Sequence, residues 1–334
     1  MSSRKREKSQ PKPKRKARPI LLVLTITYAF VVLLAPHLPP ELLIHALLCY
    51  APPQLLCIPL VCAGVPSLYL LIRKRFPRIQ LLTLLIITVS IPFIYSYELN
   101  LFKPRAVKPN LRVLTCNILF TTREVPGMLD YIRKERVDLI FLQENEGGSE
   151  SPSTYLSSRL PDYHLFADGS TAILSRWPLT ETKSIQQHSL EQRRILTAKV
   201  NAPTPFRAVT MHWSVPQISR NLKNFQHSIP MQIEDCNQLQ QVIEDERLPL
   251  IFGGDFNNPP RHALTHRLRQ HYSNAFSEVG SGPGITFASN YPFVRIDHLY
   301  TNSKIQPISC APGPSFGSDH LSLRGDFTFT TSLK

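Results

Sequence analysis

Three apolar stretches without a single charged side chain lie in the first hundred residues of the chain. They cover residues 20–36, 54–72 and 79–97. Each approaches the roughly 20 apolar residues that an α-helix needs to cross the hydrocarbon core of a bilayer. Helices of a water-soluble core would carry a regular polar face, and these stretches do not. We therefore predict about three transmembrane helices in a membrane region of residues 19–98.

The net charge of +14 is concentrated in the same part of the chain. Residues 1–18 carry a net charge of +8, and their low-complexity composition predicts a disordered tail. Residues 19–108 add +5, whereas residues 109–334 carry only +1. An overall charge that at first favours a nucleic-acid-binding protein is thus chiefly a signal of membrane topology.

The basic flanks of the apolar stretches predict their orientation. The tail and the basic cluster at 73–78 should remain in the cytoplasm, whereas the 36–53 connection carries no lysine or arginine. With three helices, the chain is predicted to be a multi-pass protein of the cytoplasmic (inner) membrane with its remainder outside the cytoplasm. Segment 41–51 is apolar too, but it is only eleven residues long. It is either a re-entrant piece or the kinked start of the second helix.

Residues 109–334 change to short β-rich runs separated by helical segments. We predict strands at 111–117, 137–143, 171–175, 194–200, 206–212, 250–252, 293–300 and 320–328, and helices at 125–135 and 230–245. The strands outnumber the helices and do not alternate steadily with them. This α/β pattern favours two packed sheets flanked by helices over one doubly wound sheet.

Polar side chains stand where several of these strands end. Asn117 ends the first strand, Glu144 follows the second, and Asp255 comes directly after a Gly-Gly pair. Oxygen ligands of this kind suit a hard cation such as Mg²⁺, which proteins hold with one or two carboxylates plus water and substrate phosphate. His212 and His320 can supply hydrogen-bond donors to a phosphoryl group.

Taken in chain order, these motifs form a specific set. They are Asn117, Gln143-Glu144, Ile173-Leu174-Ser175-Arg176-Trp177-Pro178, His212, Gly253-Gly254-Asp255-Phe256-Asn257, Arg295-Ile296-Asp297-His298 and Ser318-Asp319-His320. The set resembles the endonuclease/exonuclease/phosphatase (DNase I-like) superfamily over residues 110–330. The resemblance implies a catalytic domain of residues 109–334 with a four-layered αββα sandwich, in which two sheets lie face to face with helices outside.

The resemblance also implies a metal-binding set. Glu144 is similar to the family's principal metal carboxylate, with Asn117 beside it. Asp319 is similar to a residue that contacts the metal or the leaving group. The implied cofactor is Mg²⁺, with Mn²⁺ as the alternative.

Five further residues take catalytic roles by the same resemblance. Asp255 matches the residue that orients and deprotonates the attacking water, and Asn257 matches the amide that holds the phosphate and the transition state. His320 matches the histidine that stabilises the developing negative charge, and Asp297 the carboxylate that pairs with it. His212 matches a second phosphate donor.

Other reactive side chains are given structural interpretations. His262 and His266 have a zinc-site spacing, but without a nearby acidic partner they are expected on an exposed helix face. Arg193 is expected at a solvated strand edge rather than against a substrate phosphate. Whether Cys236 and Cys310 pair is left open.

Three functional classes fit the sequence. The first is a membrane-anchored, metal-dependent phosphoesterase that acts on a phosphodiester, a phosphomonoester or a lipid-linked phosphate. The second is an extracytoplasmic nuclease, which the charge of +1 over residues 109–334 disfavours because duplex binding depends on a basic footprint. The third is a non-catalytic binding module, which the intact catalytic set disfavours. The oligomeric state is left open.

Overall fold

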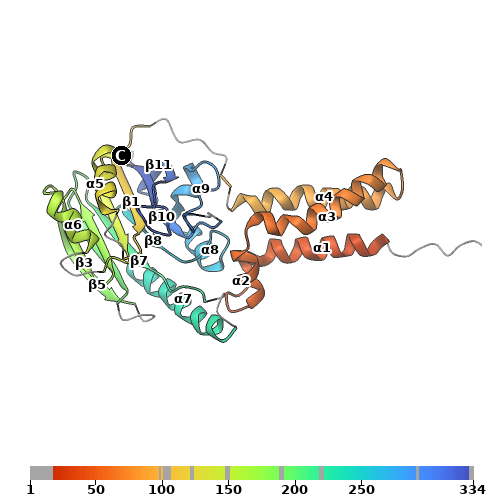
Figure 1. The fold of residues 1–334 in the computed structure, drawn as a ribbon, viewed down its shortest axis with the longest axis horizontal. Helices are drawn as coiled ribbons and strands as arrows, with labels where there is room; N and C mark the ends of the chain where they lie inside the picture. The colour runs from red at the N-terminus through yellow and green to blue at the C-terminus, as the bar shows by residue number, and fades with distance from the viewer. Residues whose placement is uncertain are drawn as a thin grey trace, which may run out of the picture.

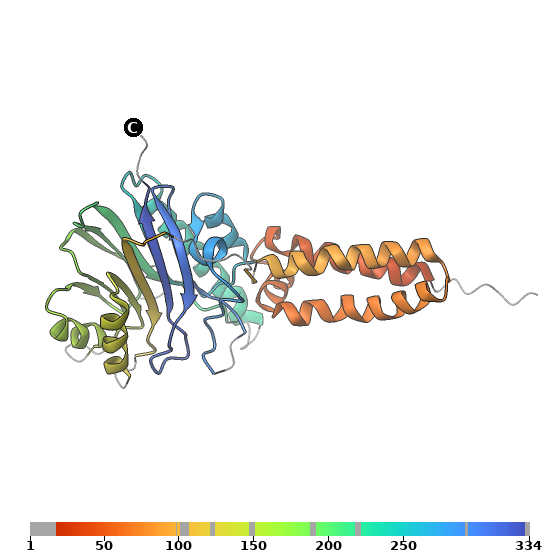
Figure 2. The ribbon, with the colours of Figure 1, turned by 90° about the horizontal axis from the view of Figure 1, so that it is seen from above.

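The structure is a computed structural model that describes residues 18–97, 99–100, 107–120, 124–146, 151–187, 192–217, 222–290 and 293–330. A bundle of three long helices projects from one side of an α/β domain (Figures 1 and 2). The predicted tail, 1–18, lies outside the described residues except for Arg18, where the first helix begins.

The bundle consists of α1 (Arg18–Leu34), α3 (Pro53–Ile72) and α4 (Pro77–Ser96). All three helices are long and apolar enough to cross a membrane, in agreement with the three predicted stretches. Their mutual contacts bury a small apolar cluster that includes Val32, Leu60 and Ile87. Large apolar side chains also cover the outside of the bundle, where Val65 and Leu85 are exposed. An apolar outer surface of this kind is typical of helices that face lipid.

Segment 41–51 forms a separate short helix, α2 (Leu43–Tyr50), after a 3₁₀ turn at Ala35–His37. The helical conformation is interrupted at Ala51 and Pro52 before α3 begins. Figure 1 places α2 at the junction between the bundle and the domain. One face is buried and the other is exposed: the buried side chains include His45, Ala46 and Cys49, and the exposed ones include Leu43, Ile44 and Leu47.

Two six-stranded mixed sheets form the centre of the domain. The first has the strand order β11-β12-β1-β2-β4-β3 and the second the order β5-β6-β7-β8-β10-β9. The bounds in the first sheet are β1 Leu111–Asn117, β2 Leu139–Gln143, β3 His164–Asp168, β4 Thr171–Ser175, β11 Ile305–Pro312 and β12 Leu323–Phe329. Those in the second are β5 Leu179–Gln186, β6 Arg194–Val200, β7 Phe206–His212, β8 Leu250–Asp255, β9 Ser273–Asn274 and β10 Asp297–Thr301.

Helices cover the outer faces of both sheets. They are α5 Val125–Glu135, α6 Pro152–Arg159, α7 Leu222–Ile243, α8 Ala263–Arg269 and α9 Ala275–Val279. Alternate residues of β1 illustrate the layering: Val113 packs between the sheets and Leu114 packs beneath α5. In the second sheet, Ile251 faces the first sheet and Phe252 packs against the helical side. The predicted four-layered αββα sandwich is confirmed.

Five predicted segments have different bounds in the structure. The strand predicted at 137–143 begins at Leu139, and the strand predicted at 250–252 extends to Asp255. The helix predicted at 230–245 begins eight positions earlier, because Pro230 lies inside α7 rather than at its start. The strand predicted at 293–300 begins at Asp297, and the strand predicted at 320–328 begins at Leu323. Strands β3, β5, β9 and β11 escaped prediction. In the edge strand β5, most side chains are polar and exposed.

Strand direction brings the motif residues to one edge of the sandwich. The parallel pair β1 and β2 ends with Asn117 opposite Gln143, and the parallel pair β7 and β8 ends with His212 opposite Asp255. The antiparallel β10 begins at the same edge, with Asp297 opposite Asp255. Rigid strands thus carry the polar side chains to a common place.

Gly254 allows β8 to approach β7 closely just before Asp255. A Cβ atom at Gly254 would lie 2.1 Å from the carbonyl oxygen of Met211. We expect Gly254→Ala to destabilise the domain by about 3 kcal/mol through overpacking, measured as a lower melting temperature of the full-length protein in detergent. The control is Gly127→Ala in α5, where a Cβ meets nothing within 4 Å. A wild-type melting temperature for Gly254→Ala would contradict the expectation.

Candidate active site

Asp255 lies at the centre of the strand-end cluster and is almost fully buried. Its Oδ2 atom is 3.1 Å from Asn117 Nδ2, 3.3 Å from His212 Nε2 and 3.7 Å from His320 Nε2. Burial alone would raise the pKa of Asp255, but the charges of His320 and His212 hold it well below its usual range. The carboxylate therefore stays ionised and accepts hydrogen bonds from Asn117 Nδ2 and from the backbone N–H of Asn257.

His320 forms a buried pair with Asp297. The distance from His320 Nδ1 to Asp297 Oδ2 is 2.9 Å. Burial would lower the pKa of His320, but the carboxylates of Asp297 and Asp255 raise it to about 10. The imidazole is thus kept protonated, and its Nε2–H remains available on the side of Asp255.

Glu144 and Asn117 stand next to this cluster. The Asn117 amide donates from Nδ2 to Glu144 Oε1 at 3.0 Å, and its Oδ1 atom accepts from the backbone N–H of Leu119 at 3.1 Å. Glu144 is only partly buried, so its carboxylate reaches the surface of the site. The accessible carboxylate of Glu144 is a ligand that suits Mg²⁺ or Mn²⁺. The buried Asn117 turns its Nδ2 towards Glu144 and Asp255, so its oxygen would face a cation there only with the amide rotated.

A second cluster has the composition of a metal site. Ligand atoms of Asp255, Asp297 and His320 all lie within 4.8 Å of one another. The hydrogen bond between His320 and Asp297 already engages two of these groups, so Glu144 is the better position for a cation.

Among the residues predicted to bind the metal, Asp319 is the one whose role the structure supports least. Its side chain contacts the hydroxyl of Ser318 at 3.4 Å. No contact joins its carboxylate to Glu144 or Asn117 among the described residues. Its charge instead acts on the neighbouring His320, whose pKa it helps to raise.

Asn257 has a left-handed backbone conformation, with φ of +50°. Its side-chain Nδ2 donates to the carbonyl oxygen of Trp213 at 2.9 Å and lies 3.3 Å from Asp255 Oδ2. Its backbone N–H donates to Asp255 Oδ1 at 2.8 Å. The turn after β8 therefore holds Asn257 and Asp255 in a fixed relation.

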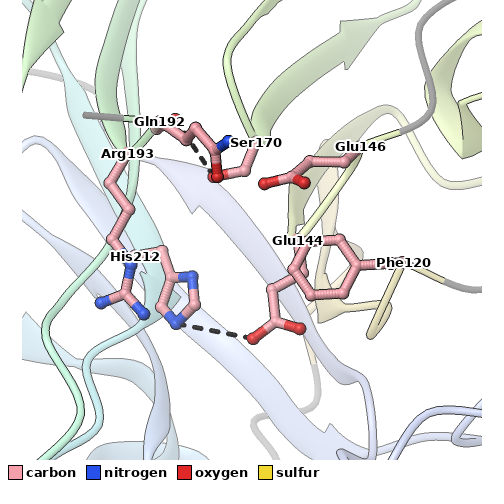
Figure 3. A pocket seen from close by; sticks show the side chains of 7 residues that line it. All are labelled: Phe120, Glu144, Glu146, Ser170, Gln192, Arg193 and His212. Carbon is pink, nitrogen blue, oxygen red and sulfur yellow. Dashed lines mark hydrogen bonds and ion pairs between the residues drawn. The ribbon is translucent and has the colours of Figure 1, made fainter. Parts of the chain in front are cut away.

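A cavity of about 260 Å³ opens next to this cluster (Figure 3). Its lining residues are Phe120, Glu144, Glu146, Ser170, Gln192, Arg193 and His212. The expectation of a solvated strand edge for Arg193 is wrong: the side chain is 8% exposed, and its guanidinium donates to the carbonyl oxygen of Trp213. Figure 3 shows Arg193 beside His212, on the side of the cavity opposite Glu144. A cation at the wall of a site with ionised carboxylates suits an anionic substrate.

Residues 114–320 match the model of the Endonuclease/Exonuclease/phosphatase family. The chain belongs to this family. It is accordingly a metal-dependent phosphoester hydrolase, and the class of non-catalytic binding modules is set aside.

Proteins of this family are similar to the chain at low identity. The uncharacterized protein YbhP of Escherichia coli strain K12 is 24% identical over 225 residues, which are 58% of this chain and 85% of YbhP. A humanized TDP2 of D. rerio is 20% identical, with a TM-score of 0.53 and coverage of 65% of this chain and 98% of that one. The mannosyl-6-phosphatase Bt3783 of Bacteroides thetaiotaomicron is 13% identical, with a TM-score of 0.53 and coverage of 66% and 100%. At these identities the solved structures support the fold of the family enzyme and no particular substrate.

The prediction that His262 and His266 lie on an exposed helix face is wrong. His262 is the N-cap residue of α8 and His266 lies within α8, and both pack against the membrane region. His262 is fully buried, and its ring packs against His45 of α2 with 4.6 Å between ring centroids. His266 packs against His37 at 5.0 Å. The two side chains belong to the contact between the domain and the membrane region. Cys236 and Cys310 are both free and buried, so they do not pair.

Proposed function

We propose that the protein is a membrane-anchored phosphoesterase that hydrolyses a lipid-linked phosphate ester at the bilayer surface. The observation that carries this proposal is the contact between α2 and the turn that holds Asn257. The hydroxyl of Tyr50, at the end of α2, donates to the carbonyl oxygen of Asn257 at 2.7 Å.

The position of α2 relates this contact to the membrane. The exposed face of α2 carries Leu43, Ile44 and Leu47, and it follows a helix long enough to span a bilayer. A short helix with an apolar face at the end of a span is suited to the boundary between headgroups and acyl chains. The reacting phosphate of a lipid would then lie close to Asn257 without leaving the bilayer.

The proposed chemistry is an in-line attack of water on the phosphorus atom. The new P–O bond forms as the opposite P–O bond to the leaving group breaks, and the leaving oxygen takes up a proton from solvent. Asp255, which stays ionised, orients the water and accepts its proton at Oδ2. His320, held protonated by Asp297, donates from Nε2 to the phosphoryl oxygens, on which negative charge grows in the transition state. His212 is proposed as a second donor to the phosphate.

Further polar groups fix the substrate around this centre. Asn257 is proposed to hold the phosphate with its side-chain amide, and Arg193 is a further candidate for the same oxygens. Glu144 and Asn117 are proposed to hold the divalent cation, with Asp319 next to the leaving group. When bound, the cation neutralises charge on the phosphoryl oxygens.

Membrane orientation is proposed from the two ends of the bundle. Figure 1 shows that α1 begins and α3 ends at the end that points away from the domain. Arg18 and the basic residues at 73–78 therefore share that end, which the charge rule assigns to the cytoplasm. The catalytic domain is accordingly proposed to lie outside the cytoplasm, at the inner membrane.

A substrate panel on full-length protein in mixed micelles tests the proposal. The panel compares sphingomyelin, an isoprenyl diphosphate, aryl phosphate mono- and diesters, plasmid DNA and RNA, with Mg²⁺ or Mn²⁺ and with EDTA as the control. We expect a lipid substrate to be hydrolysed at least about tenfold faster, as kcat/KM, than DNA or RNA, and every activity to disappear with EDTA. This factor corresponds to about 1.4 kcal/mol of preference in the transition state.

The His320→Ala variant is purified in parallel as an inactive control, so hydrolysis that remains in this preparation is assigned to contaminating enzymes. Efficient nicking of plasmid DNA without lipid hydrolysis would contradict the proposed lipid phosphoesterase and support the nuclease function instead. Because fold and catalytic set are shared across the family, only the substrate preference distinguishes the two functions.

A further inference from the structure

The membrane region touches two catalytic segments of the domain directly. The turn after β8, which carries Asn257, contacts the end of α2. The segment before β10, which leads to Asp297, contacts the end of α4 through Arg295. The junction between bundle and domain thus lies beside the proposed catalytic residues rather than at a remote face.

Tyr50 contacts the backbone of the turn at Asn257. Asn257 has a φ of +50°, a left-handed conformation that asparagine adopts more readily than most residues with a Cβ atom. The hydroxyl of Tyr50 donates to the carbonyl oxygen of this residue at 2.7 Å and also contacts the side-chain amide of Asn258. The next carbonyl oxygen, that of Asn258, lies 3.0 Å from Nε2 of the buried His298. Burial lowers the pKa of His298 to about 3, so the ring is neutral and donates this hydrogen bond.

Arg261, four positions after Asn257, forms a second contact between this part of the domain and α2. Its guanidinium donates from Nη2 to the carbonyl oxygen of Ala51 at 2.6 Å, and Cys49 Sγ donates to the carbonyl oxygen of Arg261 at 3.4 Å. Ala51 is the C-cap residue of α2. The last carbonyl groups of a helix have no partner within the helix, and a cation there is favoured by the helix dipole.

Arg295 makes the equivalent contact at the end of α4. It is almost fully buried, and its Nη2 atom donates to the carbonyl oxygen of Tyr97, the C-cap residue of α4, at 2.9 Å. Its guanidinium also lies 4.3 Å from the ring centre of Phe276. Two positions further along the chain, Asp297 holds His320. Two arginines that flank catalytic motifs thus cap two helices of the membrane region.

We infer that the membrane region is a structural part of the active site, and that Tyr50 is a positioning residue that sets the orientation of Asn257. Apolar packing of Ala46 on Phe225 and Ile229 already holds α2 against α7. The additional directional hydrogen bonds converge on the turn that carries Asn257. We explain the position of these hydrogen bonds by a need to hold Asn257 in the orientation that catalysis requires.

Kinetics of full-length Tyr50→Phe test this role. The substitution keeps the ring and removes only the hydroxyl that contacts Asn257. We expect kcat for an aryl phosphodiester to fall about tenfold with little change in KM, because the lost hydrogen bond acts on the group proposed to bind the transition state. A soluble aryl ester is used because the inference rests on the phosphoesterase activity and not on a lipid substrate.

The matched control is Tyr28→Phe in the bundle. Tyr28 donates its hydroxyl hydrogen to the carbonyl oxygen of Leu56 at 2.8 Å, within the same membrane region. Its loss removes an equivalent hydrogen bond and should leave kcat unchanged. A wild-type kcat in Tyr50→Phe, or an equal fall in Tyr28→Phe, would overturn the inference.

Hydrogen–deuterium exchange gives a second readout that needs no activity. We expect Tyr50→Phe to increase exchange in peptides that cover 255–262 and to leave the strands of the first sheet unchanged. Unchanged exchange in that turn would overturn the inference. If wild-type protein hydrolysed no phosphoester, the proposed function would fail, and exchange alone would decide the contact between Tyr50 and Asn257.

Discussion

Full-length protein that carries His320→Ala is expected to lose phosphoesterase activity by about a thousandfold while it keeps its fold. The substitution removes the donor that Asp297 and Asp255 hold in the protonated state. Loss of one preorganised donor to a developing negative charge lowers kcat by about 10² to 10³. A thousandfold loss corresponds to about 4 kcal/mol in the activation barrier.

The fold of His320→Ala should survive because the carboxyl group of Asp297, which loses its partner, can become neutral by binding a proton. Asp297 loses its partner in a buried position, and a buried carboxyl without a partner takes up a proton instead of staying charged. Circular dichroism and the melting temperature would check the fold. The control is His164→Ala, which removes an exposed imidazole from β3. Activity of His320→Ala within a factor of about ten of wild type would contradict the role given to this residue.

The Glu144→Gln variant is expected to lose activity by at least about a hundredfold and to bind Mn²⁺ more weakly. Glutamine keeps the shape of the side chain and an oxygen that accepts from Asn117, so local structure should persist. It removes the negative charge that the proposed cation site depends on. Manganese binding is measured directly by electron paramagnetic resonance of the free ion, which does not depend on turnover.

Glu124→Gln serves as the control for this variant. Glu124 is exposed at the start of α5, and the substitution removes the same charge from the same domain. We expect wild-type activity and manganese binding from it. Unchanged manganese affinity in Glu144→Gln together with lost activity would move the cation to another position and leave Glu144 with a different role.

Local sequence patterns predicted the strands that are buried on both faces. The bounds predicted for β1, β4, β6 and β7 agree with the structure, because each is a short apolar run between turn residues. Strand direction then brings Asn117, Glu144 and Asp255 to one edge, as their positions at strand ends had indicated. The roles of the motif residues were predicted from the resemblance of the whole set, in chain order, to the family.

The contact between the membrane region and the domain could not be predicted in this way. His262 and Arg193 were interpreted as exposed because no local pattern indicates what packs on them. Burial of His262 follows from α2, which lies more than two hundred positions earlier in the chain. Tyr50 lies in the apolar segment 41–51, and no local pattern there indicates that its hydroxyl contacts the turn of Asn257.

The hydrogen bonds that hold the turn of Asn257 join residues that are far apart in the sequence. Tyr50 and Asn257 are 207 positions apart, and Arg261 and Ala51 are 210 apart. Contacts across such distances form late, because closing a long loop is entropically unfavourable until other packing is in place. The helices of the bundle are synthesised before the domain. Under the proposed membrane anchoring, the catalytic turn therefore acquires its final geometry only after the bundle is in place, which would tie the onset of hydrolysis to insertion of the chain.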